Sequence, residues 1–187
     1  MQEALRLYPV VMWIDASVRM TTSNMTSVFN HVMRSGGVLL YGGTIYKNIQ
    51  TTSPVHYEYF PTEQARQVET THFPAGAIFV VLTRHNFEKI MYWYVLWALE
   101  NPGDIKPVRG TCNVTVTDRS TCHRYDQTCI NTLLSNLHNF NQSVYGLPRS
   151  EVPFYFERSD AVLASNVSHT LLMGTTTNYT RASVANK

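Results

Sequence analysis

Continuous runs of apolar residues mark the strands that this chain is expected to form. Val10–Ile14, Val38–Tyr41 and Ala77–Leu82 are short uninterrupted runs, and Val152–Phe156 is a further candidate. Uninterrupted apolar runs are typical of strands that are buried on both faces, as in a parallel sheet covered by helices. The pattern therefore predicts a buried central sheet.

Apolar residues at helical spacing alternate with these runs. Ser27–Ser35 places its apolar side chains on one helical face and is followed by Gly36–Gly37, a helix stop. Arg84–Glu100 is the clearest helix, and Asp126–Leu137 repeats apolar residues at helical spacing. Strands that alternate with helices predict an α/β fold, with a mainly parallel sheet flanked by helices.

Two stretches lack such patterns. Residues 44–75 are polar and give few periodic cues. From residue 159 onward apolar residues become sparse, and Ser, Thr and Asn increase, which predicts a disordered tail. We expect one α/β domain over residues 1–158, followed by this tail over residues 159–187.

Composition and charge narrow the possible partners. The 187 residues are 44% hydrophobic with a net charge of +2, too small to indicate a nucleic-acid partner or an anionic membrane. The longest apolar run, Ile90–Leu99, is about half the ~20 residues that span a bilayer. The first residues look like a helix already under way. We therefore expect a truncated chain, whose membrane contact would need an anchor that it lacks.

Two features favour a secretory compartment. Acceptor triplets of the form Asn-x-Ser/Thr, which matter only in a secretory lumen, occur at Asn24, Asn113, Asn141, Asn166 and Asn178. Cys112 and Cys122 flank a polar loop and either close a small disulfide, leaving Cys129 free, or remain reduced with it.

The first candidate for chemistry is Asp15, which follows the first predicted strand. Ligands of α/β folds bind outside the carboxyl ends of the strands, where a carboxylate can hold a divalent cation or a ribose hydroxyl. The alternative is that Asp15 caps the next turn. Arg19 and Arg84 are candidates for phosphate contacts or are surface residues, and the aromatic residues of Tyr92–Trp97 are expected to pack in the core.

The second candidate is the stretch CHRYDQTCIN, residues 122–131, at the start of a predicted helix. Asp126 and Gln127 fall in the first helical turn, where a carboxylate can cap its own helix. The functional alternative is that His123, Asp126 and Gln127 point into a cleft and contact metal, phosphate or sugar. The small-residue turn Ala75–Gly76 permits a close backbone approach before the third strand, or is a plain tight turn.

Several motifs together carry a family resemblance. They are WIDASVR (13–19), YFPT (59–62), AGAIFVVLTR (75–84), WYVLWALE (93–100) and CHRYDQTCIN (122–131). In this order they resemble a family of largely uncharacterised animal glycosyltransferase-like proteins that is abundant in nematodes and other invertebrates. The similarity covers most of residues 1–158.

More remotely, the chain resembles GT-A nucleotide-sugar transferases of the glycogenin and galactosyltransferase type. Their Asp-x-Asp motif, which holds Mn²⁺ and the nucleotide diphosphate, aligns with Asp15-Ala16-Ser17, where the second Asp is replaced by Ser. The resemblance implies that Asp15 and Ser17 contact a divalent cation (Mn²⁺ or Mg²⁺) and the donor. It implies that His123 is a further metal or phosphate ligand.

A second motif of these enzymes, Asp-Gln-x-x-hydrophobic-Asn, matches Asp126, Gln127 and Asn131. The resemblance implies that Asp126 and Gln127 contact the transferred hexose, and that Ala75 and Gly76 line the donor or acceptor site.

The implied activity is transfer of a hexose from a nucleotide sugar, such as a UDP-sugar, to a glycan or protein acceptor. The implied fold is GT-A-like without its N-terminal nucleotide-binding part, and the implied location of full-length relatives is the Golgi or secretory lumen. Ser17 and the missing nucleotide-binding part leave a second hypothesis, a non-catalytic lumenal binding module. A metal-dependent hydrolase using His123 and Asp126 is a third.

Overall fold

Most of the described strands coincide with predicted apolar runs, but Val18–Met20 and Gly146–Leu147 were not predicted. The computed structural model describes residues 1–100, 112–147, 151 and 154–156. The strands are β1 (Val10–Ile14), β2 (Val18–Met20), β3 (Val38–Tyr41), β4 (Ala77–Val81), β5 (Gly146–Leu147) and β6 (Phe154–Phe156). The predicted tail 159–187 lies outside the described residues, as does the start of the predicted strand Val152–Phe156.

The main sheet has the order β1-β4-β3-β5 and mixed strand directions. β4 is antiparallel to both β1 and β3, whereas β5 runs parallel to β3. A separate antiparallel pair joins β2 to β6. The predicted α/β class is confirmed, but the prediction of a mainly parallel sheet is wrong, since β3 with β5 is the one parallel pair among the described strands.

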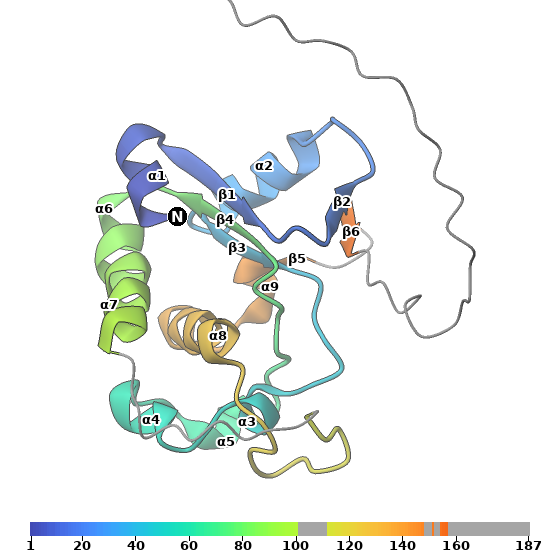
Figure 1. Cartoon of the computed structure of the whole chain (residues 1–187), viewed down its shortest axis with the longest axis vertical. Coiled ribbons are helices and arrows are strands. Elements are labelled where there is room, and N and C mark those ends of the chain that lie inside the picture. Colours follow the sequence, from blue (N-terminus) through green and yellow to red (C-terminus); the bar gives the residue numbers. More distant parts are fainter. Residues whose placement is uncertain (101–111, 148–150, 152–153, 157–187) are drawn as a thin grey trace, which may run out of the picture. The chain divides into compact units, whose positions relative to one another are not determined.

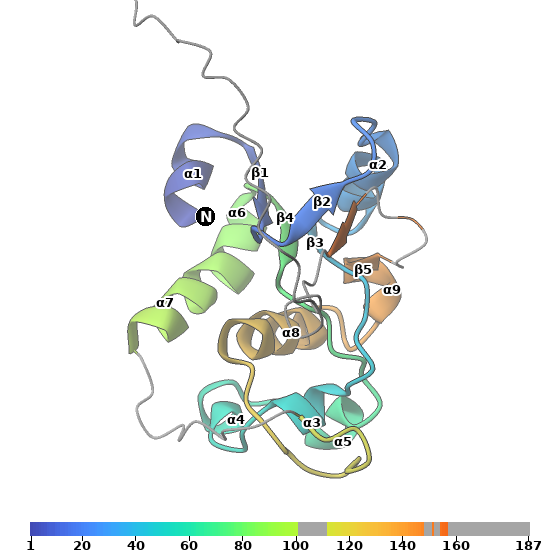
Figure 2. The same cartoon turned by 45° about the vertical axis from the view of Figure 1, so that its right-hand side comes forward.

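Burial of β3 and β4 on both faces explains why the apolar pattern did not predict the direction of the strands. On one face Leu40, Ile78 and Val80 pack against two helical segments, η1 (Phe87–Met91) and α8 (Tyr125–Leu137). On the opposite face Leu39 and Phe79 pack against α2 (Thr26–Arg34). Figures 1 and 2 show α2 and α8 on opposite sides of the sheet. Continuous apolar runs report two-sided burial, which antiparallel strands share here with parallel ones.

The helices confirm the predicted periodic segments. The remaining helices are α1 (Gln2–Leu7), α3 (Asn48–Thr51), α4 (His56–Tyr59), α5 (Gln64–Gln67), α6 (Arg84–Asn86), α7 (Tyr92–Glu100) and α9 (Gln142–Tyr145). The predicted helix over residues 84–100 consists of α6, η1 and α7 in direct succession, with η1 forming a π-helical turn. Within the described residues, no helix combines the length and the apolar character that a bilayer crossing requires.

The aromatic residues of α7 are only partly in the core. Trp97 is buried between α7, α8 and α4, as predicted. Tyr92 and Trp93 are 49% and 44% exposed, so the prediction of core packing is wrong for these two. Because α7 is apolar on all sides but packs along one face, some of its large side chains remain at the surface.

Residues 44–75 form a layer of short helices, α3, α4 and α5, beneath α8 (Figures 1 and 2). The interior of this layer is polar and buried. The Asn48 side chain donates to Gln67 Oε1 at 2.8 Å, and His72 Nδ1 lies 3.0 Å from Thr51 Oγ1. Hydrogen bonds between distant residues thus replace the apolar pattern that would have revealed these helices in the sequence.

Candidate functional site

Asp15 lies at the carboxyl end of β1, as predicted. Its backbone N–H donates to the carbonyl of Gly76 at 2.8 Å, and its own carbonyl accepts from Val18 at 3.0 Å, which closes the turn that contains Ser17. Ala75 and Gly76 are buried immediately before β4, the antiparallel neighbour of β1. The structure therefore brings Asp15, Ser17 and the Ala75–Gly76 turn together, while the Asp15 residue stays exposed.

Asp126 lies in the first turn of α8, where its carboxylate accepts hydrogen bonds from the backbone N–H groups of Asp126 and Gln127. Partial burial of the carboxyl group raises its pKa, and the negative charge of Asp15 raises this pKa further. The two carboxylates therefore lie near enough for the charge of one to act on the other. Figure 1 shows the end of β1 above the start of α8, with α7 beside them.

Tyr94, on α7, is a third titratable group near the two carboxylates. Burial raises the pKa of its phenol, and the negative charges of Asp126 and Asp15 raise it further. Cys129 is a buried thiol one helical turn after Asp126, and burial together with the Asp126 charge raises its pKa. Tyr94 and Cys129 therefore remain neutral beside the carboxylate pair, and Tyr94 can donate its phenolic proton in a hydrogen bond.

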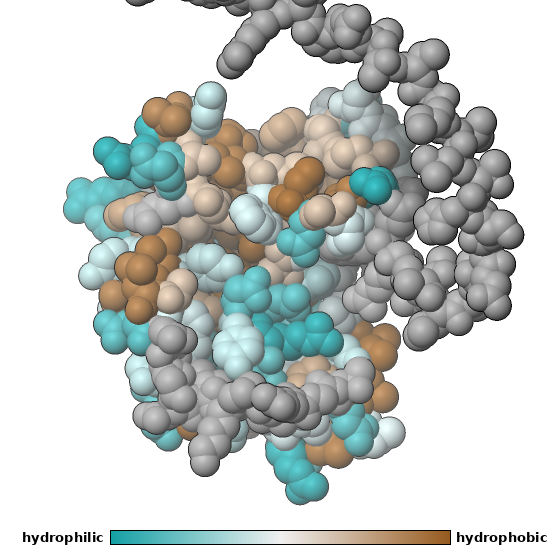
Figure 3. Space-filling view, in the orientation of Figure 1, coloured by the Kyte–Doolittle hydropathy of each residue, from teal (hydrophilic) through white to brown (hydrophobic). Residues whose placement is uncertain are grey.

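Trp13 adds an exposed aromatic surface. It pairs with Ile78 across β1 and β4, so both side chains lie on the face of the sheet that carries α8. Trp13 is 47% exposed. Figure 3, in the orientation of Figure 1, shows hydrophilic residues over the middle of the visible surface and hydrophobic residues among those above them. Trp13 precedes Asp15 by two positions. Because side chains two positions apart in a strand point to the same face, the sequence alone could have placed Trp13 beside Asp15.

The Gln127 side chain contacts the polar layer beneath α8 and not the exposed carboxylates. Its side-chain oxygen lies 3.3 Å from Nε2 of His72, a buried histidine whose Nδ1 contacts Thr51 and Asn48. Burial lowers the pKa of His72 to about 3, so its ring is neutral at physiological pH. The structure thus places Gln127 between the start of α8 and the polar layer beneath it.

Asn131, the last residue of the Asp-Gln-x-x-hydrophobic-Asn motif, holds the segment that leads into β4. Its amide donates to the carbonyls of Phe73 and Gln127 at 2.7 and 2.8 Å, and its oxygen accepts from the N–H of Phe73 at 3.0 Å. Two residues separate Phe73 from Gly76. Asn131 therefore fixes the Ala75–Gly76 turn relative to α8, and with it the position of Asp15 relative to Asp126.

His123 is buried, unlike the carboxylates. Its Nδ1 accepts from the backbone N–H of Ser53 at 3.1 Å, and its Nε2 has no hydrogen-bond partner in the described part of the chain. Its ring centre lies 5.7 Å from that of His56, and burial lowers its pKa to about 4. In residues 1–100, 112–147, 151 and 154–156, no three His, Cys, Asp or Glu side chains form a group that could hold a metal ion.

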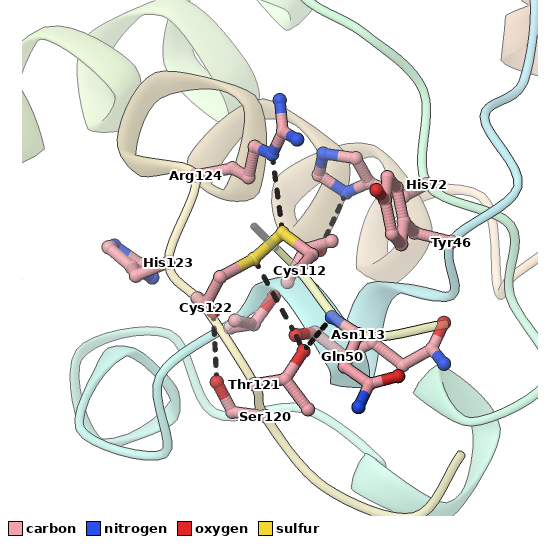
Figure 4. Close-up of a disulfide and its surroundings, with 12 residues drawn as sticks. Tyr46, Gln50, His72, Cys112, Asn113, Ser120, Thr121, Cys122, His123 and Arg124 are labelled. Carbon is pink, nitrogen blue, oxygen red and sulfur yellow. Dashed lines mark hydrogen bonds between the residues drawn. A yellow bond between two sulfur atoms is a disulfide. The ribbon is translucent and has the colours of Figure 1, made fainter. Parts of the chain in front are cut away.

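Arg124 is a candidate that the sequence did not single out. It immediately precedes α8, and its Nε donates to the sulfur of Cys112 at 3.4 Å. Its guanidinium lies 5.6 Å from the ring centre of Tyr46. Figure 4 shows the terminal nitrogens of Arg124 directed away from the sulfur atoms. Of the predicted phosphate contacts, Arg84 instead pairs with Glu88 at 2.7 Å, and Arg19 lies on β2.

The cysteines form one disulfide. Cys112 is joined to Cys122 with a Cα–Cα distance of 5.0 Å, and Cys129 remains a buried free thiol. Of the two alternatives left open by the sequence, the structure thus supports the disulfide. This bond closes the loop before α8 and places a sulfur acceptor beneath the Arg124 guanidinium (Figure 4).

Comparisons of the chain with models of known protein families, with curated proteins and with solved structures return no match. The candidate site is therefore argued from its own chemistry: two carboxylates, a neutral tyrosine, an exposed tryptophan and an arginine near the start of α8.

Proposed function

We propose that this domain is a glycosyltransferase of GT-A type that moves a hexose from a nucleotide sugar to a glycan or protein acceptor. The observation that supports the proposal is that Asp15 and Asp126, 111 positions apart in the chain, lie near enough for their charges to act on each other and on Tyr94. The family resemblance assigns these two carboxylates to the diphosphate side and the hexose side of a donor sugar.

The chemistry suits this pair. In hexosyl transfer a bond forms between the acceptor oxygen and the sugar carbon, and the bond to the diphosphate breaks. Positive charge develops on the sugar ring, and a carboxylate aimed at it stabilises the transition state. Asp126 would take this role, with Gln127 next to it, while the Trp13 ring offers a surface for the apolar face of a sugar.

A divalent cation would be a charge partner for the carboxylate pair, although these two carboxylates alone form no complete metal site in the described part of the chain. Asp15 raises the pKa of Asp126, so the two negative charges repel each other and a bound cation would relieve that repulsion. Oxygen ligands suit Mg²⁺ and Mn²⁺. Asp15 would hold the cation, with Ser17 and His123 as the further candidates; when bound, the cation neutralises charge on the diphosphate leaving group.

Arg124 would supply protein charge to the same leaving group. Its Nε is fixed by Cys112, which leaves the terminal nitrogens for a phosphate oxygen pair. Arginine binds phosphate through parallel hydrogen bonds, which lysine cannot reproduce. The diphosphate would thus lie between Asp15 and Arg124, with the hexose toward Asp126.

A secretory location accords with the surface chemistry. The asparagines of three potential N-glycosylation triplets, Asn24, Asn113 and Asn141, are all exposed. The Cys112–Cys122 disulfide suits an oxidising compartment. The triplets at Asn166 and Asn178 lie outside the described residues. We infer the Golgi or another secretory lumen as the place of action.

Calorimetric titration of the full chain with UDP and UDP-hexoses in the presence of Mn²⁺ tests the proposal. Wild-type protein is expected to bind and to release UDP slowly from the correct donor. Asp126→Asn should retain UDP binding and lose about 100-fold or more in turnover, whereas Asp15→Asn should weaken Mn²⁺-dependent binding. Asp118→Asn, an exposed acid on the disulfide loop, is the matched control.

The outcomes separate two functions. Unchanged turnover in Asp126→Asn would remove that residue from the mechanism. UDP binding without turnover would favour the second candidate, a non-catalytic binding module, for which the replacement of an acidic residue by Ser17 is the specific observation. No heat with any nucleotide at millimolar concentration would contradict a nucleotide-sugar site altogether.

A further inference from the structure

An open pocket lies on the α7–α8 side of the protein, apart from the carboxylates. Its volume is about 400 Å³, at the lower end of the range for ligand sites. We call it the aromatic pocket; the residues that matter here are Tyr59, Phe60, Lys89, Trp93, Leu133 and Asn136. They come from α4, η1, α7 and α8 and from the residue after α4, so the pocket is built where these elements meet.

The walls of the aromatic pocket are held in place by their neighbours. The Tyr59 ring packs edge-on against the buried Trp97 with ring centres 5.4 Å apart. Asn136 donates to the carbonyl of Pro61 at 3.0 Å and accepts from the Thr62 hydroxyl at 2.6 Å. A pocket whose walls are already ordered loses little conformational entropy when a ligand binds.

Its lining is mainly apolar and aromatic, with polar groups on some of the same residues. Tyr59 and Trp93 are 47% and 44% exposed, although large aromatic rings gain most from burial. Each combines an apolar ring with a polar group, a hydroxyl in Tyr59 and an indole N–H in Trp93. A sugar ring has the matching surface, since one face presents C–H groups and the rim presents hydroxyls.

Lys89 gives the pocket a positive charge. The preceding acid, Glu88, is already paired with Arg84 at 2.7 Å. No carboxylate of the described residues forms an ion pair with Lys89, and the lining of the pocket contains no acidic side chain. An ammonium group at the rim of an aromatic surface favours a ligand that carries a negative charge.

We propose that the aromatic pocket binds an acidic glycan, with a sugar ring stacked on Trp93 and Tyr59 and its carboxylate or sulfate against Lys89. The binding itself does not depend on the proposed transferase activity. The assignment of this glycan as the acceptor does rest on that activity.

The position of the pocket suits an acceptor. Asp126 and Leu133, which lines the pocket, are seven positions apart on α8. Seven residues of helix correspond to about 10 Å along its axis. An oligosaccharide anchored at Trp93 would therefore need only a few sugar units to reach the Asp15–Asp126 site.

The test compares two probes, lactose and sialyllactose, which share a neutral disaccharide and differ by one acidic sugar. Binding to the full chain is followed by calorimetry and tryptophan fluorescence. Wild-type protein is expected to bind sialyllactose more tightly than lactose. Trp93→Ala should weaken both by about tenfold, and Tyr59→Ala is a second variant should Trp93→Ala fail to fold.

Two further variants test the role of the Lys89 charge and provide a control for the loss of an aromatic residue. Lys89→Gln should reduce sialyllactose affinity to the lactose level and leave lactose binding unchanged. Tyr8→Ala, which removes an aromatic residue that is 62% exposed and does not line the pocket, should match wild type.

Three results would overturn the proposal: no binding of either probe or of any glycan on a broad array, equal affinity for both probes, or unchanged affinities in Trp93→Ala and Lys89→Gln. A measurement of UDP binding distinguishes failure of this proposal from failure of the proposed function. A chain that binds sialyllactose through Trp93 but binds no nucleotide would keep the pocket and lose the transferase.

Discussion

Removal of the Cys112–Cys122 disulfide should destabilise the protein by an amount that the loop length predicts. The double variant Cys112→Ser, Cys122→Ser opens a loop with a sequence separation of 10. Loop-closure entropy for about ten residues corresponds to about 2.7 kcal/mol at 25 °C. Both side chains are buried, so the substituted hydroxyls add a further cost of about 1 kcal/mol or more. We expect a total loss of about 3–4 kcal/mol.

Urea unfolding of both proteins, followed by circular dichroism, measures this loss. With a typical slope of about 2 kcal/mol per molar urea, the midpoint should fall by about 1.5–2 M. The same variant removes the sulfur that accepts from Arg124, so UDP affinity should fall as well. A midpoint shift below about 0.3 M would show that this loop contributes little to the fold, and would also remove the support proposed for Arg124.

Two further predictions concern buried polar groups. Burial lowers the pKa of His56 and His72 to about 3 and of His123 to about 4, from 6.5. The unfolded chain therefore binds more protons than the folded chain below about pH 6.5. The free energy of unfolding should be at its full value above that pH and should fall by up to about 1.4 kcal/mol per pH unit per histidine toward pH 4. Equal urea midpoints at about pH 7 and about pH 5 would contradict this. Asn131→Ala leaves the N–H and C=O of Phe73 without their partner and should cost about 2–4 kcal/mol in thermal or urea unfolding. The exposed Asn30→Ala should cost almost nothing, and an equal effect of the two would refute the positioning role of Asn131.

The elements with regular patterns could be predicted from the sequence. The apolar runs at β3 and β4 and the periodic faces of α2 and α8 correctly predicted buried elements. The prediction of a buried strand is wrong for β1, which lies at the edge of the sheet and has only exposed or half-buried side chains. Strand direction could not be predicted, because two-sided burial gives the same apolar run in either direction. The short helices of residues 44–75 could not be predicted either, because Asn48, Gln67 and His72 are satisfied by partners far away in the chain.

The candidate site was predictable in part. The positions of Asp15 at a strand end and Asp126 in a first helical turn follow from local pattern, and in the structure the charge of Asp15 acts on Asp126. Gln127 pairs with His72, a contact across 55 positions that no local pattern indicates. Arg124 was missed because its position depends on a disulfide that the sequence left undecided.

Tyr94 packs half-buried against the core, as predicted, but its position near the carboxylates was not predicted. On a helix as apolar as α7, composition does not show which aromatic residue faces a neighbour and which faces a site. Tyr94 lies near the carboxylates because α7 packs along α8, and that packing depends on residues more than 30 positions away.

The account depends most on Asp15 and Asp126 sharing one site, and the titration of Asp126 tests this directly. The carboxyl-carbon chemical shift of Asp126 is followed by NMR against pH in the full chain and in Asp15→Asn. The account predicts a raised pKa for Asp126 in the wild type and a lower pKa in the variant, because the repelling charge has been removed. An identical Asp126 titration in both proteins would place the two carboxylates in separate sites and contradict the proposed function.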